Sequence, residues 1–512
     1  MKLRDLVSRL PHKVVLGDPL IEVTGLAYHS REVKEGYLFA AVRGLRADGK
    51  QFIPEACARG ARSLLVEDPV EGSGATQVVV PRAREALAQV ASAFYGDPSL
   101  SLTVIGITGT NGKTTISYLL ESILTEAGKK TGVVGTVNYR YAGQVRPAAT
   151  TTPESLDLQK LLAGMREAGV THAVLEVSSH ALDMQRVKAC HFDVALFTNL
   201  TRDHLDYHGS MEKYFRAKEL LFTESLQESR KKNLFAIINR DDPRGEELCR
   251  SAFGTILRYG IKNRGEVYPE RFSGDLDGIR AEIITPRGRL EIASPLIGLH
   301  NLSNLLAAVT AAEALEIPPE ITARGVEKMA RVPGRLDRVP GGKGVRIFVD
   351  YAHTPDALER ALETLRSACP ARLLVIFGCG GDRDRGKRPV MGKTAALGGD
   401  WAVLTSDNPR TEEPLRILGE IEAGIRETGL PRLTPEHLSA GDGQRGYVVI
   451  PDRREAIART IGAARSGDVV LIAGKGHEDY QVLGTDKIHF DDREEALAAL
   501  QARKGEGRKT GK

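Results

Sequence analysis

Short apolar runs rich in valine and isoleucine alternate with longer amphipathic stretches through the central and C-terminal parts of this chain. This alternation is the pattern of βαβ units on a parallel sheet, and it constrains the fold more than any other feature. The runs that we expect to be strands are 102–107, 172–177, 193–199, 234–239, 345–350, 372–378, 400–405 and 468–474. Segments such as 355–368 and 452–464 have the helical pattern. We therefore predict an α/β protein with two distinct, mostly parallel sheets.

The length of the chain requires more than one hydrophobic core. It has 512 residues, whereas a single domain averages about 150. Turn-rich segments at 96–101 and 331–335 indicate the joints. We predict a small α/β domain over 1–97, a central domain over 98–333 and a C-terminal domain over 334–503. The remaining residues, 504–512, are polar and basic, and we expect a disordered tail there.

Composition excludes several classes of protein. Lys and Arg (71) barely exceed Asp and Glu (67) and are interspersed with them, so no basic surface for nucleic acid is indicated. No apolar stretch approaches the about 18 residues of a membrane span, and the first residues lack a signal-peptide core. The cysteines are odd in number and form no CxxC, which argues against zinc sites and disulfides. They are Cys57, Cys190, Cys249, Cys369 and Cys379. We expect a cytoplasmic, monomeric protein that acts on small molecules.

The strongest local signal is GITGTNGKTT at 106–115, between a strand-like run and an amphipathic stretch. Glycines let backbone N–H groups close around phosphate oxygens, and the start of the helix adds positive potential. Lys113 is expected to reach the β and γ phosphates of a nucleotide, and Thr114 to ligate Mg²⁺. The expected nucleotide contacts are Gly109, Thr110, Asn111, Gly112, Lys113, Thr114 and Thr115. Because Ile107 stands where GxxxxGK[ST] has its first glycine, a glycine-rich turn with an incidental lysine is the alternative.

The TGTNGKTT form of this loop resembles that of the Mur ligases and folylpolyglutamate synthases, which are ATP-dependent and form amide bonds. Further segments resemble the MurE type of Mur ligase. They are HSR at 29–31, ATTTP at 149–153, EVSSH at 176–180, TNLTRDHLDYHG at 198–209, AK at 217–218, HNLSN at 300–304, PGR at 333–335, DYAHTP at 350–355, GCGGDR at 378–383, DNPR at 407–410 and GKGHE at 474–478. The resemblance implies an N-terminal domain for a uridine nucleotide, a central phosphate-loop ATPase and a C-terminal Rossmann-like domain for an amino acid.

The activity implied by the resemblance adds the third residue of the peptidoglycan stem peptide. The D-glutamyl γ-carboxylate of UDP-N-acetylmuramoyl-L-alanyl-D-glutamate attacks ATP to give an acyl phosphate, which the amine of the incoming residue displaces. Because two anions must meet, the site requires cations. The implied catalytic residues are Lys113, Glu176, His204 and Lys218, and the implied Mg²⁺ ligands are Thr114, Glu176, His204 and Lys218, the last as a carbamate formed with CO₂. The alternatives are a solvated Glu176, a hydrogen-bonding His204 and a solvated Lys218.

The resemblance also assigns residues to the nucleotide substrates. Asn301, Arg335 and Asp350 match ATP contacts, although helix capping is the alternative for Asn301 and Asp350. Hydroxyls and an arginine suit the diphosphate and carboxylate oxygens of the UDP-sugar peptide. The matched positions are Tyr28, Ser30, Arg46, Ala47, Asp48, Thr151, Thr152, Ser178 and Arg186. Tyr28 and Met184 stand where some relatives carry leucine and glutamine, so Met184 is left out of the set.

The DNPR segment at 407–410 resembles that of the enzymes that add meso-2,6-diaminopimelate, whereas lysine-adding relatives vary it. Diaminopimelate ends in both an ammonium and a carboxylate, and lysine ends in an ammonium alone. An arginine fork suits the additional carboxylate. We assign Arg383 and Arg410 to the carboxylate, Asp407 and Glu478 to the ammonium, and Asn408, Pro409 and Gly474 to the rest of the pocket. The alternatives are a purely structural Asn-Pro turn, a lysine-adding ligase, and a regulatory phosphate-loop ATPase.

Overall fold

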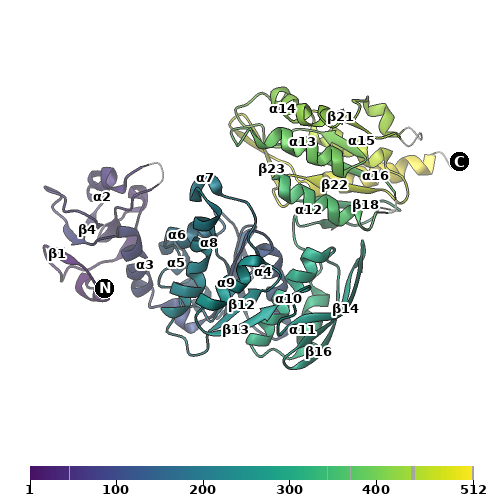
Figure 1. Ribbon diagram of the computed structural model, residues 1–512. Coiled ribbons are helices and arrows are strands. Elements are labelled where there is room, and N and C mark those ends of the chain that lie inside the picture. The colour runs from purple at the N-terminus through teal and green to yellow at the C-terminus, as the bar shows by residue number, and fades with distance from the viewer. Residues whose placement is uncertain (45–46, 343, 370, 440–443, 510–512) are drawn as a thin grey trace. The chain divides into compact units, whose positions relative to one another are not determined.

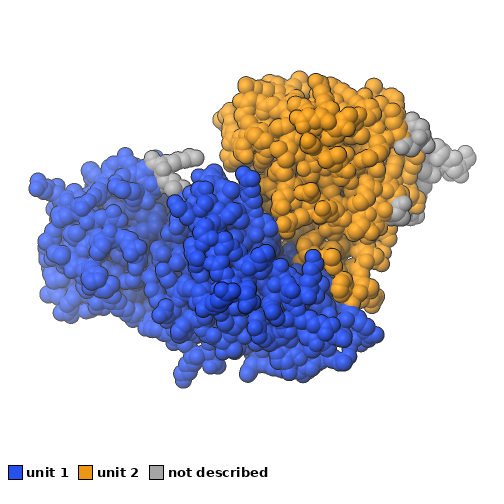
Figure 2. Space-filling model, viewed as in Figure 1, with its two compact units in different colours: residues 1–271, 281–292, 302–329 blue, residues 272–280, 293–301, 330–512 orange. Residues whose placement is uncertain are grey.

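The computed structural model describes residues 1–44, 47–342, 344–369, 371–439 and 444–509. The chain is a three-domain α/β protein (Figure 1) that divides into two compact units (Figure 2). Unit 1 comprises Met1–Arg271, Ala281–Ile292 and Leu302–Met329. Unit 2 comprises Phe272–Arg280, Ala293–Asn301 and Ala330–Lys512. Within the described ranges, no helix is both long enough and apolar enough to span a membrane.

The N-terminal domain is built on a sheet with the strand order β1-β5-β4-β3-β2, in which β1 alone of the described strands pairs antiparallel. The strands are β1 (Val14–Leu16), β2 (Gly25–Ala27), β3 (Tyr37–Ala40), β4 (Ala61–Val66) and β5 (Thr76–Val79). The helices are α1 (Leu3–Leu6), α2 (Ile53–Ala58) and α3 (Ala83–Phe94). Leu156 of the central domain packs into the same apolar cluster as Leu87 of α3. At the joint, Asp97 pairs with Arg9 at 2.6 Å and with Arg230 of the central domain at 2.9 Å. These shared contacts explain why the first two domains form one unit.

The central domain contains a larger sheet with the order β13-β12-β11-β6-β10-β7-β8-β9. Its strands are parallel from β13 to β7 and antiparallel at β8 and β9. They are β6 (Thr103–Thr108), β7 (Thr131–Val134), β8 (Asn138–Tyr141), β9 (Gln144–Pro147), β10 (His172–Glu176), β11 (Val194–Phe197), β12 (Phe235–Asn239) and β13 (Thr255–Tyr259). The helices are α4 (Lys113–Glu126), α5 (Ser155–Glu167), α6 (Ser179–Asp183), α7 (Leu205–His208), α8 (Met211–Leu220), α9 (Pro243–Ser251), α10 (Leu299–Ala314) and α11 (Pro319–Lys328). A smaller sheet has the order β14 (Tyr268–Asp275), β15 (Gly278–Thr285) and β16 (Gly288–Ser294).

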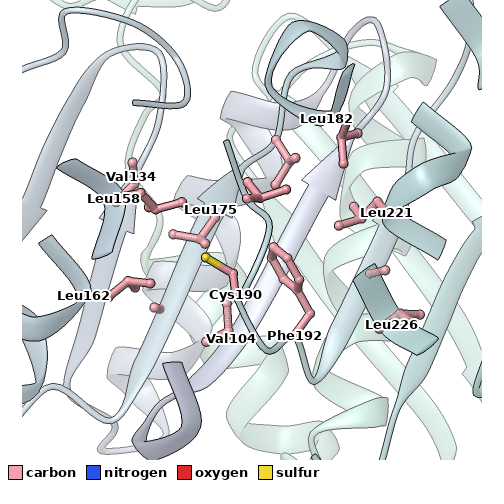
Figure 3. Close-up of a cluster of buried hydrophobic side chains, with 14 of the residues drawn as sticks. Val104, Val134, Leu158, Leu162, Leu175, Leu182, Cys190, Phe192, Leu221 and Leu226 are labelled. Carbon is pink, nitrogen blue, oxygen red and sulfur yellow. The ribbon is translucent and has the colours of Figure 1, made fainter. Parts of the chain in front are cut away.

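A close-packed apolar core covers one face of the central sheet around Phe192 (Figure 3). Val104, Leu175, Phe192 and Leu221 are all fully buried in this cluster. Gly106 on β6 leaves room for the ring, because a Cβ there would lie 2.7 Å from Phe192 Cε1. Close packing of this kind fixes the position of β6, the strand from which the phosphate loop emerges.

The C-terminal domain is a Rossmann-like sheet with the order β17-β18-β22-β19-β20-β21, parallel except for β17. The strands are β17 (Asp337–Val339), β18 (Arg346–Asp350), β19 (Leu373–Phe377), β20 (Trp401–Leu404), β21 (Gly446–Val449) and β22 (Val469–Ala473). A hairpin of β23 (Tyr480–Leu483) and β24 (Asp486–His489) follows. The helices are α12 (Pro355–Arg366), α13 (Lys387–Gly398), α14 (Pro414–Arg426), α15 (Arg453–Ala463) and α16 (Asp492–Lys509). Apolar clusters lie on both faces of the sheet.

All eight runs that the sequence predicts as strands are strands in the structure, within one or two residues at each end. The parallel strands β7, β13 and β21 were not predicted, because Gly132, Arg258 and Gly446 interrupt or shorten their apolar runs. The boundary predicted after residue 503 falls inside α16, whose backbone stays helical to Lys509. The disorder of the tail stays a prediction for 504–509, and 510–512 lie outside the described residues.

Candidate active site

The loop between β6 and α4 depends on glycine for its shape. Gly109 and Gly112 have positive φ angles of 144° and 94°, which side chains disfavour. A Cβ at Gly109 would lie 1.8 Å from Thr198 Oγ1. That hydroxyl donates to the carbonyl of Asn111 at 2.6 Å and so holds the loop in place. The loop is thus a specific conformation at the start of a helix, as a phosphate-binding loop requires.

Asn199 supports the same loop from the neighbouring strand. Its carbonyl accepts from the N–H of Thr110 at 2.8 Å, and its Oδ1 accepts from the N–H of Asn111 at 3.0 Å. This is possible because β11 pairs directly with β6, so the segments that follow the two strands lie together. The sequence matched Thr198 and Asn199 to a family segment without giving either a role. The structure identifies both as supports of the loop.

Two lysines converge on one carbonyl of this loop. Lys113 Nζ donates to Gly109 O at 2.8 Å and to Thr110 O at 2.9 Å, and Lys218 Nζ donates to Gly109 O at 2.9 Å. Lys218 is only 2% exposed and lies 4.5 Å from the centre of the Tyr214 ring. Burial, together with the positive charge of Lys113, lowers the pKa of Lys218 well below its usual value. The alternative of a solvated Lys218 is wrong.

Glu176 ends β10 beside the loop and is 1% exposed, so the alternative of a solvated carboxylate is also wrong. Thr114 Oγ1 donates to its Oε2 at 3.0 Å, and Thr136 donates to both oxygens, from N at 3.1 Å and from Oγ1 at 2.8 Å. Among the described residues no cation pairs with this carboxylate. A buried carboxylate beside a hydroxyl, with only neutral donors, is an oxygen set that suits Mg²⁺.

His204 lies next to this group but is more open, with a side chain 45% exposed. Burial lowers its pKa, while Asp203, whose Oδ2 is 3.5 Å from Nε2, acts in the opposite direction. Its ring centre is 5.9 Å from that of Tyr214, the ring that also faces Lys218. In the described part of the chain, no three His, Cys, Asp or Glu side chains form a ready metal cluster. Only Thr114 and Glu176 of the predicted ligands are in direct contact.

Aromatic side chains surround His204 and were not predicted. The ring of His180 lies 4.8 Å from His204, 4.2 Å from Tyr207 and 5.4 Å from His208. His208 shares a hydrogen bond of 3.0 Å with Ser179 Oγ. His180 lies in the segment EVSSH and His208 in the segment TNLTRDHLDYHG, and both segments resemble the family. This resemblance is the sequence signal that could have identified the two histidines. They lie on α6 and α7, whose side chains therefore surround His204.

The N-terminal residues predicted to hold the UDP-sugar contact other residues of unit 1. Tyr28 Oη donates to Asp157 Oδ2 of α5 at 2.5 Å, and burial and this carboxylate raise the tyrosine pKa. Ser30 Oγ donates to Glu55 at 2.7 Å. Asp48 caps a short turn by accepting from the N–H of Lys50 at 3.0 Å, and the carbonyl of Ala47 accepts from Gly44 at 2.8 Å. Arg46 lies outside the described residues.

The central residues predicted for the same substrate converge after β10. Thr152 Oγ1 donates to the carbonyl of Glu176 at 2.8 Å and accepts from the N–H of Ser178 at 3.1 Å. Arg186 Nη1 donates to Thr152 O at 3.1 Å, and its Nε is buried with no hydrogen-bond partner among the described residues. Thr151 Oγ1 is 3.1 Å from Thr136 Oγ1, which joins the group to Glu176. Hydroxyls, an arginine and the phosphate loop therefore share one edge of the central sheet.

Three predicted ATP contacts belong to unit 2. Asp350 ends β18, and its oxygens accept from the N–H groups of Leu336 at 2.6 Å and Ala352 at 2.8 Å. Burial raises its pKa, and Arg335 opposes that shift. Helix α12 is capped by Thr354, so the capping alternative for Asp350 is wrong. Asn301 lies within α10 and its amide donates to Ile297 O at 2.9 Å.

The predicted amino-acid residues gather where β20 and β22 end. Asn408 Nδ2 donates to Glu478 Oε2 at 2.9 Å, which joins two segments 70 residues apart. Gln481 of β23 donates to the carbonyl of Asp407 at 2.6 Å. Gly474 has a positive φ of 116°, and a Cβ there would lie 3.6 Å from Asp407 Oδ2. Burial raises the pKa of Asp407, while Arg453 and then Lys475 oppose that shift.

Arg410 and Arg383 both lie beside Gly380. A Cβ at Gly380 would be 2.8 Å from Arg410 Nη1 and 3.7 Å from Arg383 Cγ. Arg410 Nη1 donates to Gly381 O at 2.8 Å, and its backbone has a positive φ of 51° fixed by pairing with Val482 and Gly484. Arg383 is exposed and donates to Asp382 O at 2.9 Å. Arg410 is therefore held in place, and the buried Pro409 precedes it in the turn.

Comparison with known proteins agrees with this arrangement. Residues 22–95 match "Mur ligase family, catalytic domain", residues 107–312 match "Mur ligase middle domain", and residues 334–476 match "Mur ligase, glutamate ligase domain". The UDP-N-acetylmuramoyl-L-alanyl-D-glutamate–2,6-diaminopimelate ligase of Geobacter metallireducens is 47% identical over 511 residues, which cover 99% of this chain and 100% of that protein. The ligase of the same name from Geobacillus thermodenitrificans is 45% identical over 98% of this chain and 100% of its own.

Solved structures show the same relationship. A structure of UDP-N-acetylmuramoyl-L-alanyl-D-glutamate–2,6-diaminopimelate ligase superposes with a TM-score of 0.71 at 33% identity, covering 98% of this chain and 99% of that one. The MurF ligase of Thermotoga maritima, solved in complex with ADP, shares the fold with a TM-score of 0.61 at 22% identity, covering 96% of this chain and 100% of its own. The chain belongs to the Mur ligase family, among the relatives named UDP-N-acetylmuramoyl-L-alanyl-D-glutamate–2,6-diaminopimelate ligase.

Proposed function

We propose that this chain joins meso-2,6-diaminopimelate to the D-glutamyl γ-carboxylate of UDP-N-acetylmuramoyl-L-alanyl-D-glutamate, with conversion of ATP to ADP and phosphate. The reaction is a step in the synthesis of the peptidoglycan precursor. The names of its relatives support the proposal, and so does the presence of both a phosphate loop and an amino-acid pocket in one chain.

The observation that carries the choice of amino acid is the group formed by Asp407, Asn408, Arg410 and Glu478. Two carboxylates and an arginine lie within one small region at the ends of β20 and β22. This combination of charges complements the far end of diaminopimelate, which bears an ammonium and a carboxylate. Lysine has no carboxylate there for Arg410 to bind. The pocket therefore favours diaminopimelate over lysine on charge alone.

The first chemical step requires the γ-carboxylate to attack the γ-phosphate of ATP. An oxygen of the carboxylate forms a bond to phosphorus, and ADP leaves with the electrons of the broken P–O bond. Lys113, at the start of α4, neutralises charge on the phosphates as the two anions approach. Thr198 and Asn199 hold the backbone of the loop, and the N–H groups that they do not use are available to orient the same phosphates. In the second step the amine of diaminopimelate attacks the acyl carbon, and phosphate leaves as the nitrogen loses a proton.

Thr114 and Glu176 would hold a Mg²⁺ ion, with His204 and a carbamylated Lys218 as further ligands. The ion supplies positive charge that stabilises the phosphate oxygens during transfer. Lys218 is suited to carbamate formation because its depressed pKa leaves a fraction of neutral amine, the form that adds to CO₂. The carbamate carries a negative charge where the ammonium carried a positive one. Carbamate formation would therefore convert Lys218 from a group that repels a metal cation into an oxygen ligand for it.

The UDP-sugar peptide is assigned to the edge where Thr151, Thr152, Ser178 and Arg186 meet, together with the N-terminal residues Tyr28, Ser30, Arg46, Ala47 and Asp48. The buried Nε of Arg186 makes no hydrogen bond among the described residues, although Glu154 Oε2 lies 3.7 Å from it. This supports a role for the guanidinium in binding an anionic group. Asn301, Arg335 and Asp350 are assigned to ATP, and Arg383, Pro409 and Gly474 to the amino-acid pocket.

Release of ADP in the presence of a panel of amino acids tests the proposal. We expect release only when UDP-N-acetylmuramoyl-L-alanyl-D-glutamate and diaminopimelate are both present. Preference for L-lysine would show that the amino acid is wrongly assigned. Steady ADP release without either co-substrate would instead indicate a regulatory ATPase.

A further inference from the structure

Lys475 is a buried cation that the chemistry described so far does not use. It lies in the GKGHE segment directly after β22, between Gly474 and Glu478, and its side chain is 0% exposed. Burying an unpaired ammonium is costly, so such a lysine persists only where anions or strong acceptors surround it. The identity of its partners therefore indicates what it does.

The partners of Lys475 are residues of the proposed amino-acid pocket. Its Nζ donates to Glu478 Oε2 at 3.1 Å and to Asn408 Oδ1 at 3.3 Å. Asn408 Nδ2 donates to the same oxygen of Glu478 at 2.9 Å, which closes a triangle of three side chains. The third neighbour is Asp407, whose Oδ1 lies 3.8 Å from Nζ.

Asp407 Oδ1 differs from the oxygen of Glu478 in one respect. Glu478 Oε2 already accepts two hydrogen bonds, whereas Asp407 Oδ1 is buried and accepts none from the described residues. Lys475 is too far from it for a hydrogen bond but close enough to attract it. A buried carboxylate oxygen without a donor is a place where a donor is expected to bind.

We propose that Lys475 is a positioning residue of the amino-acid pocket: its ammonium fixes the carboxylate of Glu478 and the amide of Asn408 and leaves Asp407 Oδ1 as the acceptor for the ammonium of the incoming amino acid. The charge balance supports this division. Asp407 and Glu478 carry two negative charges and Lys475 carries one positive charge, so one negative charge remains for one ammonium. This inference deepens the proposed function and rests on it.

The test compares Lys475→Met with Lys487→Met. Both lysines face the Tyr480 ring, at 5.3 Å and 3.6 Å from its centre, but Lys487 is exposed on β24 and has no contact with the pocket residues among those described. For Lys475→Met we expect KM for diaminopimelate to rise at least tenfold, with KM for ATP and for the UDP-sugar peptide within twofold of wild type. Lys487→Met should leave all three values unchanged. The fluorescence of Trp401, the single tryptophan of the chain, reports whether each C-terminal domain is folded.

A double-mutant cycle separates positioning from direct binding. If Lys475 acts mainly through Glu478, then Lys475→Met should raise KM for diaminopimelate clearly less in a Glu478→Gln background than in wild type, because only the contact with Asn408 remains to be lost. Equal effects in the two backgrounds would overturn the proposal. So would an unchanged KM in Lys475→Met, or a uniform loss of affinity for all three substrates.

A second variant, Lys475→Gln, keeps the test decisive if Lys475→Met does not fold. Lys475→Gln keeps a donor for Asn408 without the charge, and we expect it to raise KM for diaminopimelate as well. If neither variant folds, Lys475 supports the domain rather than the pocket, and the proposal is wrong. A wild-type chain that ligates no amino acid would overturn the proposed function and this inference together. An active wild type with unaffected variants would overturn this inference alone.

Discussion

Replacing Asp492 with asparagine should destabilise the C-terminal domain strongly. Arg453 of α15 and Asp492 of α16 are both 0% exposed and form a two-armed ion pair. Arg453 Nε donates to Oδ1 and Nη2 to Oδ2, each at 2.7 Å, and Nη2 also donates to Ala473 O at 3.0 Å. The substitution keeps the size of the side chain and removes the charge that compensates the buried guanidinium.

The magnitude follows from that burial. Removing one partner of a buried ion pair costs about 3–5 kcal/mol, because the remaining charge stays out of water. The same two helices provide a matched control. Arg454 and Glu495 pair at 2.9 Å, but the arginine side chain is 64% exposed and the glutamate side chain 14%. Because water reaches the arginine that Glu495→Gln leaves behind, the pair should contribute about 0–1 kcal/mol and its loss should have little effect.

Urea unfolding followed by Trp401 fluorescence measures the difference. Trp401 lies on β20 with 1% exposure, in the same apolar cluster as Ile457 of α15 and Ala496 of α16. Because it is the only tryptophan, its signal reports this domain and not the other two. The free energy of unfolding should fall by about 3–5 kcal/mol in Asp492→Asn and by less than about 1 kcal/mol in Glu495→Gln.

Equal effects of the two substitutions would refute the reasoning, because burial is what distinguishes the pairs. A third variant sharpens the test. Arg453→Met combined with Asp492→Leu replaces the pair with apolar side chains and should unfold at a higher urea concentration than Asp492→Asn. If the double variant were the less stable one, the cost would come from lost packing rather than from an unpaired charge.

Three further predictions concern the reaction and its pH dependence. Lys218→Ala should abolish ligation, and added chloride or a short carboxylate should restore part of it at fixed Mg²⁺; full activity without rescue would contradict a carbamate ligand. Arg410→Ala should weaken use of diaminopimelate by about 2–4 kcal/mol in kcat/KM with KM for ATP unchanged; an equal loss for both would point to misfolding. Burial lowers the pKa of His477 to about 4. In the unfolded chain this histidine has a pKa of about 6.5, so between about pH 6.5 and 4 the unfolded state binds a proton that the folded state does not. The free energy of unfolding should therefore fall as pH drops through this range. His477→Gln should flatten that fall in urea midpoints, and an unchanged slope would exclude this histidine as its cause.

The sequence predicts eight strands of the two large sheets well, because each is a continuous apolar run rich in valine and isoleucine. Once Thr103–Thr108 and His172–Glu176 are known to be parallel neighbours, the meeting of the phosphate loop with Glu176 follows from topology. The boundary between the first two domains is less visible. It lies in a turn-rich segment, yet Leu156 and the Arg230–Asp97 pair join the flanking parts into one unit. Such contacts connect residues far apart in the chain, and no local pattern records them.

Buried charges are the features that local patterns predict least. Lys218, Arg453 and Lys475 each have an exposure of 2% or less, although lysine and arginine are usually exposed. Whether such a residue faces water depends on which partners the fold brings to it, and these partners are distant in the sequence. Lys218 is 109 residues from Gly109, Arg453 is 39 residues from Asp492, and Lys475 is 67 residues from Asn408. All three lie at or behind the ends of parallel strands, where loops from different strands meet. Because side chains from separate segments surround a charge at such an edge, the edge proposed to bind the substrates is also where the sequence alone says little about each residue.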